Sequence, residues 1–447
     1  MAVRRFRGPT VIPLLATLLL SPARPDTSYV AGGVTVIQRV DTTTRLAAIG
    51  LYLLGGTRIL TPKTAGIEQL FIRTAWSGTR KYPQDGGTRT LARTGAFETI
   101  QVEADWTTIW LQGFAADFDT AWSVLADQMT NPTFSDTAFA LAHKQLLAAA
   151  RTRYQDPQER IRALADSVMF AGHPYALDPR GTVSSIEPLT VSDVQQFQRR
   201  EMVTSRMLLV VVGNISPHHV EELVQSTLGG LPHGSYNWTL PPLFGYREGR
   251  AHWVIEHRLL PTTYLLGYCP GPEPSSPLYW SFRIMNSIYS GWLGHEIRGR
   301  GLSYAAYAPF LDRALPIGGF EMSTNAPDRA YPLALGQLRD LADLDMSTGG
   351  DEAYTGADSW LFWSRAVKRS YLQGLRFEQA TVLGGALTLA RAQLLYGDYR
   401  KLDAMAPGHG AFEDRNLANA AAWCRTHMDF AYLGDTTKMK GQWKPAY

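Results

Sequence analysis

The sequence predicts an α+β protein made of two homologous domains, each a mainly antiparallel sheet flanked by helices. The first observation is a repeated opening, because segments 34–40 and 46–54 are typical of paired β-strands and so are segments 252–258 and 262–268. The second is that a helical segment, two more strands and long helices follow both openings. The third is a stretch rich in Pro and Gly at 232–250, which divides the chain into halves of similar size. This order indicates internal duplication of one α+β unit.

The first half is predicted to form a domain over 30–231. Its apolar residues recur at helical spacing in some segments and form strand-like runs in others. Helices are expected at 64–77, 116–129 and 136–152, and strands at 97–103, 106–114 and 207–215. Ser216 is expected to cap the helix that follows the last of these strands, with Pro217 in its first turn.

The second half is predicted to form a domain over 251–447, after a linker at 232–250. Helices are expected at 278–290, near 327–344, at 383–395 and at 413–426, and strands at 302–308, 317–323 and 429–433. The second half thus repeats the order of elements in the first half.

Size and composition bound the function. The chain has 447 residues, of which 45% are apolar and 19% charged, so it is long enough for two domains with full cores. The net charge of +3 gives no reason to expect nucleic acid or an anionic membrane as a partner. Cys269 and Cys424 are too few for a disulfide framework or a cysteine-rich zinc site. One bridge between them is possible, but two buried free thiols are favoured.

The N-terminal residues predict a secretory signal over 1–23. The basic stretch MAVRRFRG precedes the apolar run VIPLLATLLL at 11–20, and SPA follows, with cleavage expected after Ala23. Ten apolar residues are too few to span a bilayer, and no other window predicts a transmembrane segment. Because no acidic residue precedes Asp26, a mitochondrial presequence is the alternative. The leucine-rich run favours export, with the bacterial periplasm as the expected location.

Common catalytic motifs are absent from the sequence. It contains no G-x-x-x-x-G-K, no G-x-S-x-G, no H-E-x-x-H and no G-x-G-x-x-G after a strand. None of the ten histidines pairs with another at metal-ligand spacing on a helix. His143 and His173 are therefore expected to have structural roles.

Two segments frame the helix predicted at 64–77, namely TPKTAGI at 61–67 and AWSGTRKYP at 75–83. They resemble the frame of the zinc-binding helix in the pitrilysin/insulinase-type metallopeptidases, also called inverzincins. Further matching segments are TGAFETIQVEADWTTIWL at 94–111, NPTF at 131–134, DPQER at 156–160, GHPYALDPRGTVSSIEPLT at 172–190 and LLVVVGNI at 208–215. The resemblance implies the pitrilysin/LuxS-like metallohydrolase fold.

The resemblance also places the family's catalytic groups, and this chain lacks them. In the family the helix carries two zinc-binding His residues and a Glu that acts as general base, and a later helix adds a Glu ligand. Alignment on the framing glycines puts Gln69 and Arg73 at the His positions, Ile72 at the base and Ala149 at the last ligand. Arginine adds a positive charge where the metal would sit. The resemblance therefore implies a non-catalytic member without the HxxEH motif, with no metal and no other cofactor in this chain.

The family's substrate-binding edge strand carries Asn-Ala, and here Thr99 and Ile100 stand at those positions. An edge strand can pair with an extended peptide through its backbone whatever its side chains are. The resemblance therefore implies a peptide-binding edge at this strand that lacks the Asn side-chain contact.

The segment HEIRGRGLSYAAYA at 295–308 resembles the family's R-x-x-R-G-L-x-Y, whose Arg and Tyr contact substrate held at the zinc centre. The matches are Arg298 and Tyr304. Because the spacing between them is one residue shorter than usual, Arg300 is the alternative arginine. A tyrosine hydroxyl can donate to the oxygen that gains negative charge, and an arginine can fork onto peptide carbonyls. The alternative is that GRGLSY is only a turn that feeds a core strand.

Two functions follow from the resemblance. The first is a non-catalytic subunit of an exported heterodimeric peptidase, which supplies chamber walls and the Arg/Tyr pair to a zinc-bearing partner and does not cleave peptides alone. Its other partner would be a peptide or unfolded protein substrate. The alternative is a structural or peptide-binding scaffold related to respiratory-complex core subunits, with no proteolytic role. One zinc-less relative carries a long glycine-rich loop in its C-terminal half. The corresponding stretch here, SIYSGWLGHEIRGRG, is short and has no such loop, so the scaffold function is the less favoured of the two.

Overall fold

The computed structural model describes residues 26–237, 252–344, 357–402 and 413–439. The predicted signal segment 1–23 lies outside the described residues, and so does most of the predicted linker. Within the described ranges no helix is long and apolar enough to cross a membrane.

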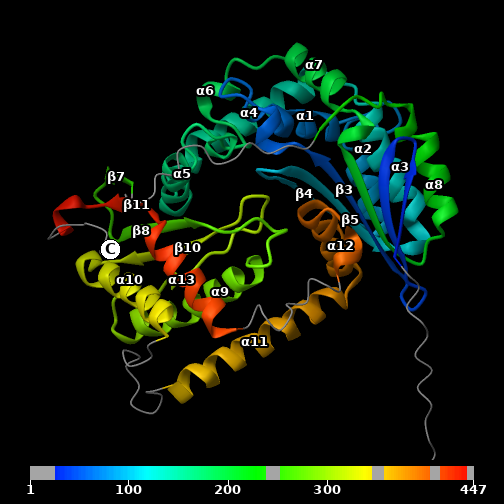
Figure 1. Ribbon diagram of the computed structural model, residues 1–447. Helices are drawn as coiled ribbons and strands as arrows, with labels where there is room; N and C mark the ends of the chain where they lie inside the picture. The colour runs from blue at the N-terminus through cyan, green and yellow to red at the C-terminus, as the bar shows by residue number, and fades with distance from the viewer. Residues whose placement is uncertain (1–25, 238–251, 345–356, 403–412, 440–447) are drawn as a thin grey trace, which may run out of the picture.

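Two sheets form the framework (Figure 1). The first has, in spatial order, β1 (Thr27–Ala31), β2 (Val34–Val40), β6 (Met207–Gly213), β3 (Leu46–Leu54), β5 (Trp106–Phe114) and β4 (Phe97–Val102). The second has β7 (Trp253–His257), β11 (Asp429–Gly434), β8 (Thr263–Pro270), β10 (Ile317–Thr324) and β9 (Ala306–Tyr307). Thirteen α-helices flank the two sheets within the described residues.

The helices of the first half are α1 (Ile67–Trp76), α2 (Gly86–Thr94), α3 (Phe118–Thr130), α4 (Asp136–Arg153), α5 (Pro157–Met169), α6 (Val183–Ile186), α7 (Val191–Glu201) and α8 (Pro217–Ser226). Those of the second half are α9 (Tyr279–Gly299), α10 (Pro327–Asp343), α11 (Ala357–Gln379), α12 (Val382–Tyr396) and α13 (Asp414–Thr426). The α+β architecture of two helix-flanked sheets is as predicted.

The topology shows the duplication. Apart from β1, the strand order of the first sheet, β2-β6-β3-β5-β4, corresponds strand for strand to β7-β11-β8-β10-β9 in the second. In these two five-strand orders the first pairs, β2-β6 and β7-β11, are parallel, and the other pairs are antiparallel. The equivalent strands also follow one another in the same chain order, so one unit has been used twice.

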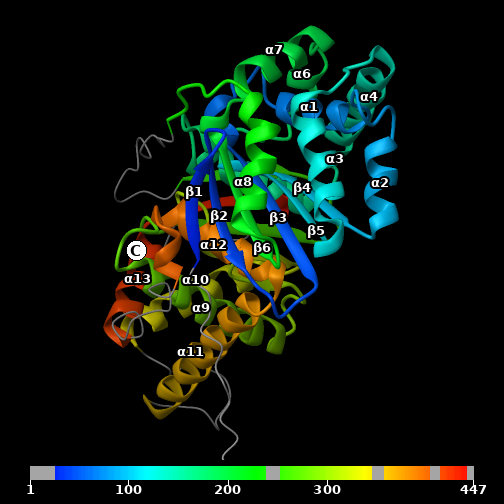
Figure 2. The same ribbon diagram turned by 90° about the vertical axis from the view of Figure 1, so that its right-hand side faces the viewer.

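The two halves exchange a helix. Helix α5 of the first half packs on the second sheet, where its Ile161 and Leu164 join a buried cluster with Leu266 of β8. Helix α12 of the second half packs on the first sheet, where Leu389 shares a buried cluster with Val210 of β6. Because α5 and α12 hold equivalent places in the chain order, the exchange is reciprocal. Figure 2 shows the first sheet with α3 and α8 on one face and α12 behind it.

Ion pairs reinforce the exchanged helix α5. Arg160 contacts Glu256 of β7, and Arg162 contacts Glu321 of β10 at 3.0 Å. The carboxylate of Asp105, in the β4–β5 turn, accepts a hydrogen bond from the backbone N–H of Ala314 in the second half at 2.9 Å. Polar contacts and apolar packing therefore hold the halves together at several separate places.

Several sequence expectations need correction. Only Ala306–Tyr307 of the segment expected as a strand at 302–308 pair in the sheet, because the residues after α9 turn through Gly301 at φ 66°. The helix expected at 278–290 continues to Gly299. The prediction of two free thiols is wrong, because Cys269 of β8 and Cys424 of α13 form a disulfide. The cap of α8 is confirmed, since Ser216 Oγ accepts from the backbone N–H of His219 at 3.2 Å.

Reducing this disulfide is expected to destabilise the protein by about 2 to 5 kcal/mol, because the bridge closes a long loop in the unfolded chain. The two cysteines are 155 residues apart in sequence. The check is a denaturant titration of the double variant Cys269→Ala, Cys424→Ala against the oxidised protein. An unchanged midpoint would contradict this expectation.

Candidate functional site

Helix α1 is placed by a glycine contact. Its N-cap, Gly66, has φ 91°, a conformation that favours glycine, and a Cβ there would lie 3.0 Å from the Cα of Gly181. The Gly66 backbone N–H also donates to the carbonyl of Pro179 at 3.2 Å. These contacts fix where α1 begins, and α1 packs against α4 and α7.

The four positions expected for zinc chemistry lie on α1 and α4, and they do not fit a zinc ion. Ile72 is 3% exposed within the apolar core, whereas Arg73 and Ala149 face solvent. Gln69 is half-buried, and its Oε1 has no hydrogen-bond partner among the described residues. Zinc in proteins takes Cys, His or carboxylate ligands, and this set offers none of them. Within the described ranges no group of three or more His, Cys, Asp and Glu side chains could hold a metal.

A buried ion pair beside these positions was not predicted. Glu68 of α1 meets Arg206 at 3.1 Å, and their side chains are 0% and 1% exposed. Arg206 also donates to the backbone carbonyls of Leu54 at 2.6 Å and Glu201 at 2.8 Å. Burial raises the pKa of Glu68, and the Arg206 charge opposes that rise. The pair joins α1 to the end of β3 and to α7, so its role is to position the helix.

Strand β4 is the edge strand that carries Thr99 and Ile100. It pairs only with β5 among the described strands. The pair that closes the hairpin is Glu103 with Trp106, joined by an N–H···O bond of 3.0 Å. Because bonded and non-bonded pairs alternate along an antiparallel ladder, Ile100 directs its backbone groups to the free edge and Thr99 directs its own to β5. An added peptide strand would therefore bond to Ile100 and its alternate neighbours.

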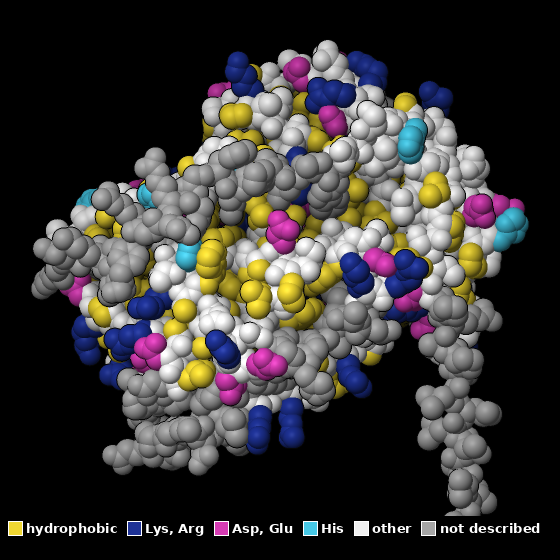
Figure 3. Space-filling model, in the orientation of Figure 1, with side chains coloured by type: hydrophobic (Ala, Val, Ile, Leu, Met, Phe, Trp, Pro, Cys, Tyr) yellow, Lys and Arg dark blue, Asp and Glu magenta, His cyan; other side chains and the backbone are white. Residues whose placement is uncertain are grey.

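A cavity of about 340 Å³ lies between this edge of the first sheet and the exchanged helix α12. Aromatic side chains of the sheet form its floor, leucines of α12 its roof, and polar side chains of β4 its side. The lining residues are Tyr52, Thr99, Gln101, Glu103, Trp106, Thr108, Trp110, Asp312, Leu383, Leu387, Arg391 and Leu394. In the view of Figure 3, hydrophobic side chains gather in the middle of the face, where the two halves meet. Sequence reasoning missed this cavity because its walls come from both halves.

The aromatic floor depends on a glycine. Tyr52 meets Trp110 and Trp106 edge-on, with ring centroids 5.5 and 6.2 Å apart. Gly50 of β3 pairs with Trp110 in the sheet, and a Cβ at Gly50 would lie 2.3 Å from the indole ring. The absence of a side chain at this position therefore lets the indole lie over β3.

Replacing Gly50 with alanine is expected to destabilise the protein by about 1 to 3 kcal/mol, because the indole of Trp110 must move within a packed region. Thermal unfolding and tryptophan fluorescence measure the effect. Gly291→Ala is the matched control, since nothing lies within 4 Å of that added Cβ on α9 and alanine favours a helix. Equal stability of the two variants would contradict the assigned contact.

Arg298 and Tyr304 lie together at the end of α9. The guanidinium of Arg298 lies 5.1 Å from the centroid of the Tyr304 ring and donates to the Tyr304 backbone carbonyl at 3.3 Å. Tyr304 is 86% exposed, so its hydroxyl is open to solvent. Arg300 instead pairs with Glu296, one turn earlier, at 2.8 Å. Of the two candidate arginines, Arg298 is the one beside Tyr304.

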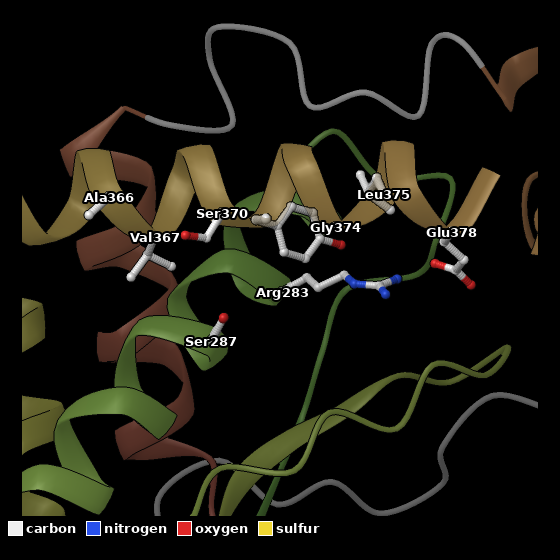
Figure 4. A pocket seen from close by; sticks show the side chains of 9 residues that line it. Arg283, Ser287, Ala366, Val367, Ser370, Gly374, Leu375 and Glu378 are labelled. Carbon is white, nitrogen blue, oxygen red and sulfur yellow. The ribbon is translucent and has the colours of Figure 1, made fainter. Parts of the chain in front are cut away.

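A second cavity, of about 470 Å³, lies between α9 and α11 (Figure 4). Arg283 of α9 and Glu378 of α11 both line it. Asp312 accepts from Arg283 at 2.6 Å and meets Arg391 at 3.2 Å, while Arg391 meets Glu378 at 3.6 Å. These four side chains form a row of alternating charges that links the walls of the two cavities. Their two positive and two negative charges balance.

Two family models match the chain over successive stretches. Residues 35–181 match the model described as insulinase (peptidase family M16), and residues 188–349 match the model described as peptidase M16 inactive domain. The chain belongs to peptidase family M16. The family inferred from the framing segments of α1 is thereby confirmed, and this M16 chain is a member whose sequence lacks the HxxEH motif.

Curated relatives of the M16 chain are distant. It is 22% identical over 270 residues to the mitochondrial-processing peptidase subunit beta of Lentinula edodes, covering 60% of this chain and 58% of the relative. It is 24% identical over 275 residues to the cytochrome b-c1 complex subunit 1 of Caenorhabditis elegans, covering 62% and 58%. The chain spans about three fifths of the length of the first curated relatives it matches.

Solved structures support the M16 fold. A protease from Helicobacter pylori superposes with a TM-score of 0.80 at 15% identity, covering 92% of this chain and 99% of that one. A peptidase M16 inactive domain from Pseudomonas fluorescens gives 0.78 at 16% identity, covering 92% and 98%. The periplasmic protease PqqL from Escherichia coli gives 0.71 at 14% identity, covering 97% of this chain and 49% of that one. At such low identity these likenesses show the fold alone.

Proposed function

We propose that this chain is the non-catalytic subunit of an exported, heterodimeric M16 peptidase. It supplies chamber walls and the Arg298/Tyr304 pair to a zinc-bearing M16 partner, and it holds no metal or other cofactor itself. The observation that carries the proposal is a contrast between two sites. The α1 and α4 positions offer no zinc donor, while Tyr304 remains exposed beside Arg298.

The chemistry of the pair suits a partner's reaction centre. A tyrosine hydroxyl donates a hydrogen bond to an oxygen that gains negative charge during attack on a peptide carbonyl. The guanidinium of Arg298 lies against the Tyr304 ring, which positions that ring and leaves the hydroxyl to solvent. The free edge of β4 offers backbone groups to an extended peptide. These residues can bind and orient a substrate, and the bond cleavage itself requires the partner's zinc.

The disulfide supports export. Disulfides form and persist in oxidising compartments such as the bacterial periplasm and are rare where thiols are kept reduced. Cys269 and Cys424 are both fully buried and joined to each other. Together with the signal predicted over 1–23, this favours the periplasm over the mitochondrion as the place where the chain works.

A scaffold with no proteolytic role is the second candidate function. One relative is a cytochrome b-c1 complex subunit, so the M16 fold also occurs in a protein named for a respiratory complex. In that case Tyr304 would have no reaction centre to serve.

The test is peptide cleavage by the purified chain, alone and mixed with an M16 protein that carries an intact H-x-x-E-H helix. Activity only in the mixture, and its loss on adding a chelator, supports the proposal. A mixture that cleaves no faster than the zinc-bearing chain alone favours the scaffold. Chelator-sensitive cleavage by this chain alone would contradict both functions.

A further inference from the structure

We propose that the cavity between β4 and α12 is a subsite for a cationic side chain, arginine or lysine, of an extended peptide paired to the edge of β4. This inference rests on the proposed function for the presence of a peptide at that edge. It adds the chemical class of side chain that the site selects.

The register of β4 brings one row of peptide side chains to the cavity. Thr99 and Gln101 line the cavity and stand opposite Trp110 and Thr108 of β5, which line it too. Side chains at directly opposed positions of neighbouring strands lie on the same face, with Cβ atoms about 4.5–5.5 Å apart. A peptide residue opposite Thr99 or Gln101 therefore projects its side chain over the α12 face of the sheet.

The remaining charge in the cavity is negative. Asp312 and Arg391 face it but pair with each other, and their outer neighbours Arg283 and Glu378 balance as well. Glu103 also lines the cavity, and no ion pair to it occurs among the described residues, although the charge of Arg391 acts on it as well as on Asp312. Trp106 donates a hydrogen bond to the Glu103 carboxylate. Displacement of water by neighbouring groups raises the pKa of Glu103, and the hydrogen bond from Trp106 and the charge of Arg391 oppose that rise. The residue as a whole is exposed.

The floor and roof suit the stem and the charge of such a side chain. Trp110 and Trp106 line the cavity, and the face of an indole ring attracts a cation through its quadrupole. Leu383 and Leu387 of α12 offer apolar surface to the methylene stem. The volume of about 340 Å³ is many times the roughly 10–15 Å³ that one water requires, which leaves room for a long side chain.

The test is binding of two labelled peptides to the isolated full chain, measured by fluorescence anisotropy. The peptides consist of alternating threonine and alanine and differ only at a central residue, which is arginine in one and its neutral isostere citrulline in the other. The arginine peptide is expected to bind about tenfold tighter. Equal binding of the two peptides, or binding of neither, overturns the proposal.

Two substitutions and one control variant locate the preference for the arginine peptide. Glu103→Gln is expected to abolish the tenfold difference, whereas Glu98→Gln is expected to keep it, because Glu98 lies on the same strand but bonds to Trp76 on the opposite face at 2.8 Å. Leu387→Trp, which fills the cavity from α12, is expected to weaken binding of the arginine peptide at least tenfold. A preference that survives both Glu103→Gln and Leu387→Trp would place the recognition elsewhere and overturn the subsite.

A failure of the cationic subsite can be distinguished from a failure of the proposed function. A chain that binds both peptides equally and still activates a zinc-bearing companion loses the cationic subsite and keeps its role as a subunit. A chain that prefers the arginine peptide but activates no companion keeps the subsite and loses that role.

Discussion

Replacing Tyr304 with phenylalanine is expected to lower the kcat of the assembled peptidase by about a hundredfold or more, with little change in KM. Removal of one donor to a developing oxyanion costs about 10² to 10³ in kcat, because the interaction is made mainly in the transition state. The substitution leaves the aromatic ring, and hence its contact with Arg298, in place. Steady-state kinetics of mixtures prepared with each variant measure the effect.

The two neighbouring arginines are expected to behave differently, and Arg300 provides the matched control. Arg298→Ala removes the guanidinium that lies against the Tyr304 ring, so a loss in kcat/KM is expected. Arg300→Ala removes an equally basic side chain two residues later, which pairs with Glu296 on the same helix, and no more than a twofold change is expected. Full activity of the Tyr304→Phe mixture would remove the role assigned to the hydroxyl.

Replacing Arg206 with methionine is expected to destabilise the chain by about 3 to 5 kcal/mol, because it leaves the Glu68 carboxylate buried without its cation. The guanidinium also satisfies the carbonyls of Leu54 and Glu201, which would lose a donor. The free energy of unfolding in urea is the measurement. The double variant Glu68→Met, Arg206→Met is expected to be more stable than Arg206→Met alone, since no unpaired charge remains.

The stability that the chain loses in Arg206→Met is expected to depend on pH. Burial raises the pKa of Glu68, and removing the opposing charge raises it further. Between the unfolded pKa and this raised folded pKa, the folded state holds a proton that the unfolded state has released, so stability falls as the pH rises. The free energy of unfolding of the variant should therefore be closer to that of the wild type at pH 5 than at pH 8.

An exposed ion pair on α7 gives the control for the buried pair. Arg200→Met breaks the contact between Arg200 and Glu201, in which the Arg200 side chain is 64% exposed, and a change within about 0.5 kcal/mol is expected. A loss for Arg206→Met no larger than that for Arg200→Met would contradict the assigned pair.

The sequence predicted those elements whose pattern is local. The strand expected at 46–54 is β3 to the residue, and that at 106–114 is β5. The first is an almost unbroken apolar run, and the second is rich in the aromatic and β-branched residues that favour strands. The helix expected at 136–152 is α4, whose serine cap the structure contains. The short β1 at 27–31 and helix α2 at 86–94 were not predicted, since β1 is largely exposed and α2 is rich in Thr and Gly.

The remaining features depend on contacts between distant residues. Glu68 and Arg206 are 138 residues apart, and nothing in either local sequence marks them as partners. The cavity needs Trp110 of one half and Leu387 of the other, and it exists only because α12 packs on the sheet of the other half. Cys269 and Cys424 carry no spacing signal, so their pairing emerged only from the packing of α13 beside β8.

The loss of the zinc site in this chain is tested most directly by the metal content of the isolated chain after exposure to zinc and gel filtration, measured by mass spectrometry. A variant carrying Gln69→His, Ile72→Glu, Arg73→His and Ala149→Glu restores the family's three zinc ligands and its general base on α1 and α4, and serves as the comparison. The natural chain is expected to retain no stoichiometric zinc. About one zinc per natural chain, lost on unfolding of the N-terminal half, would contradict it.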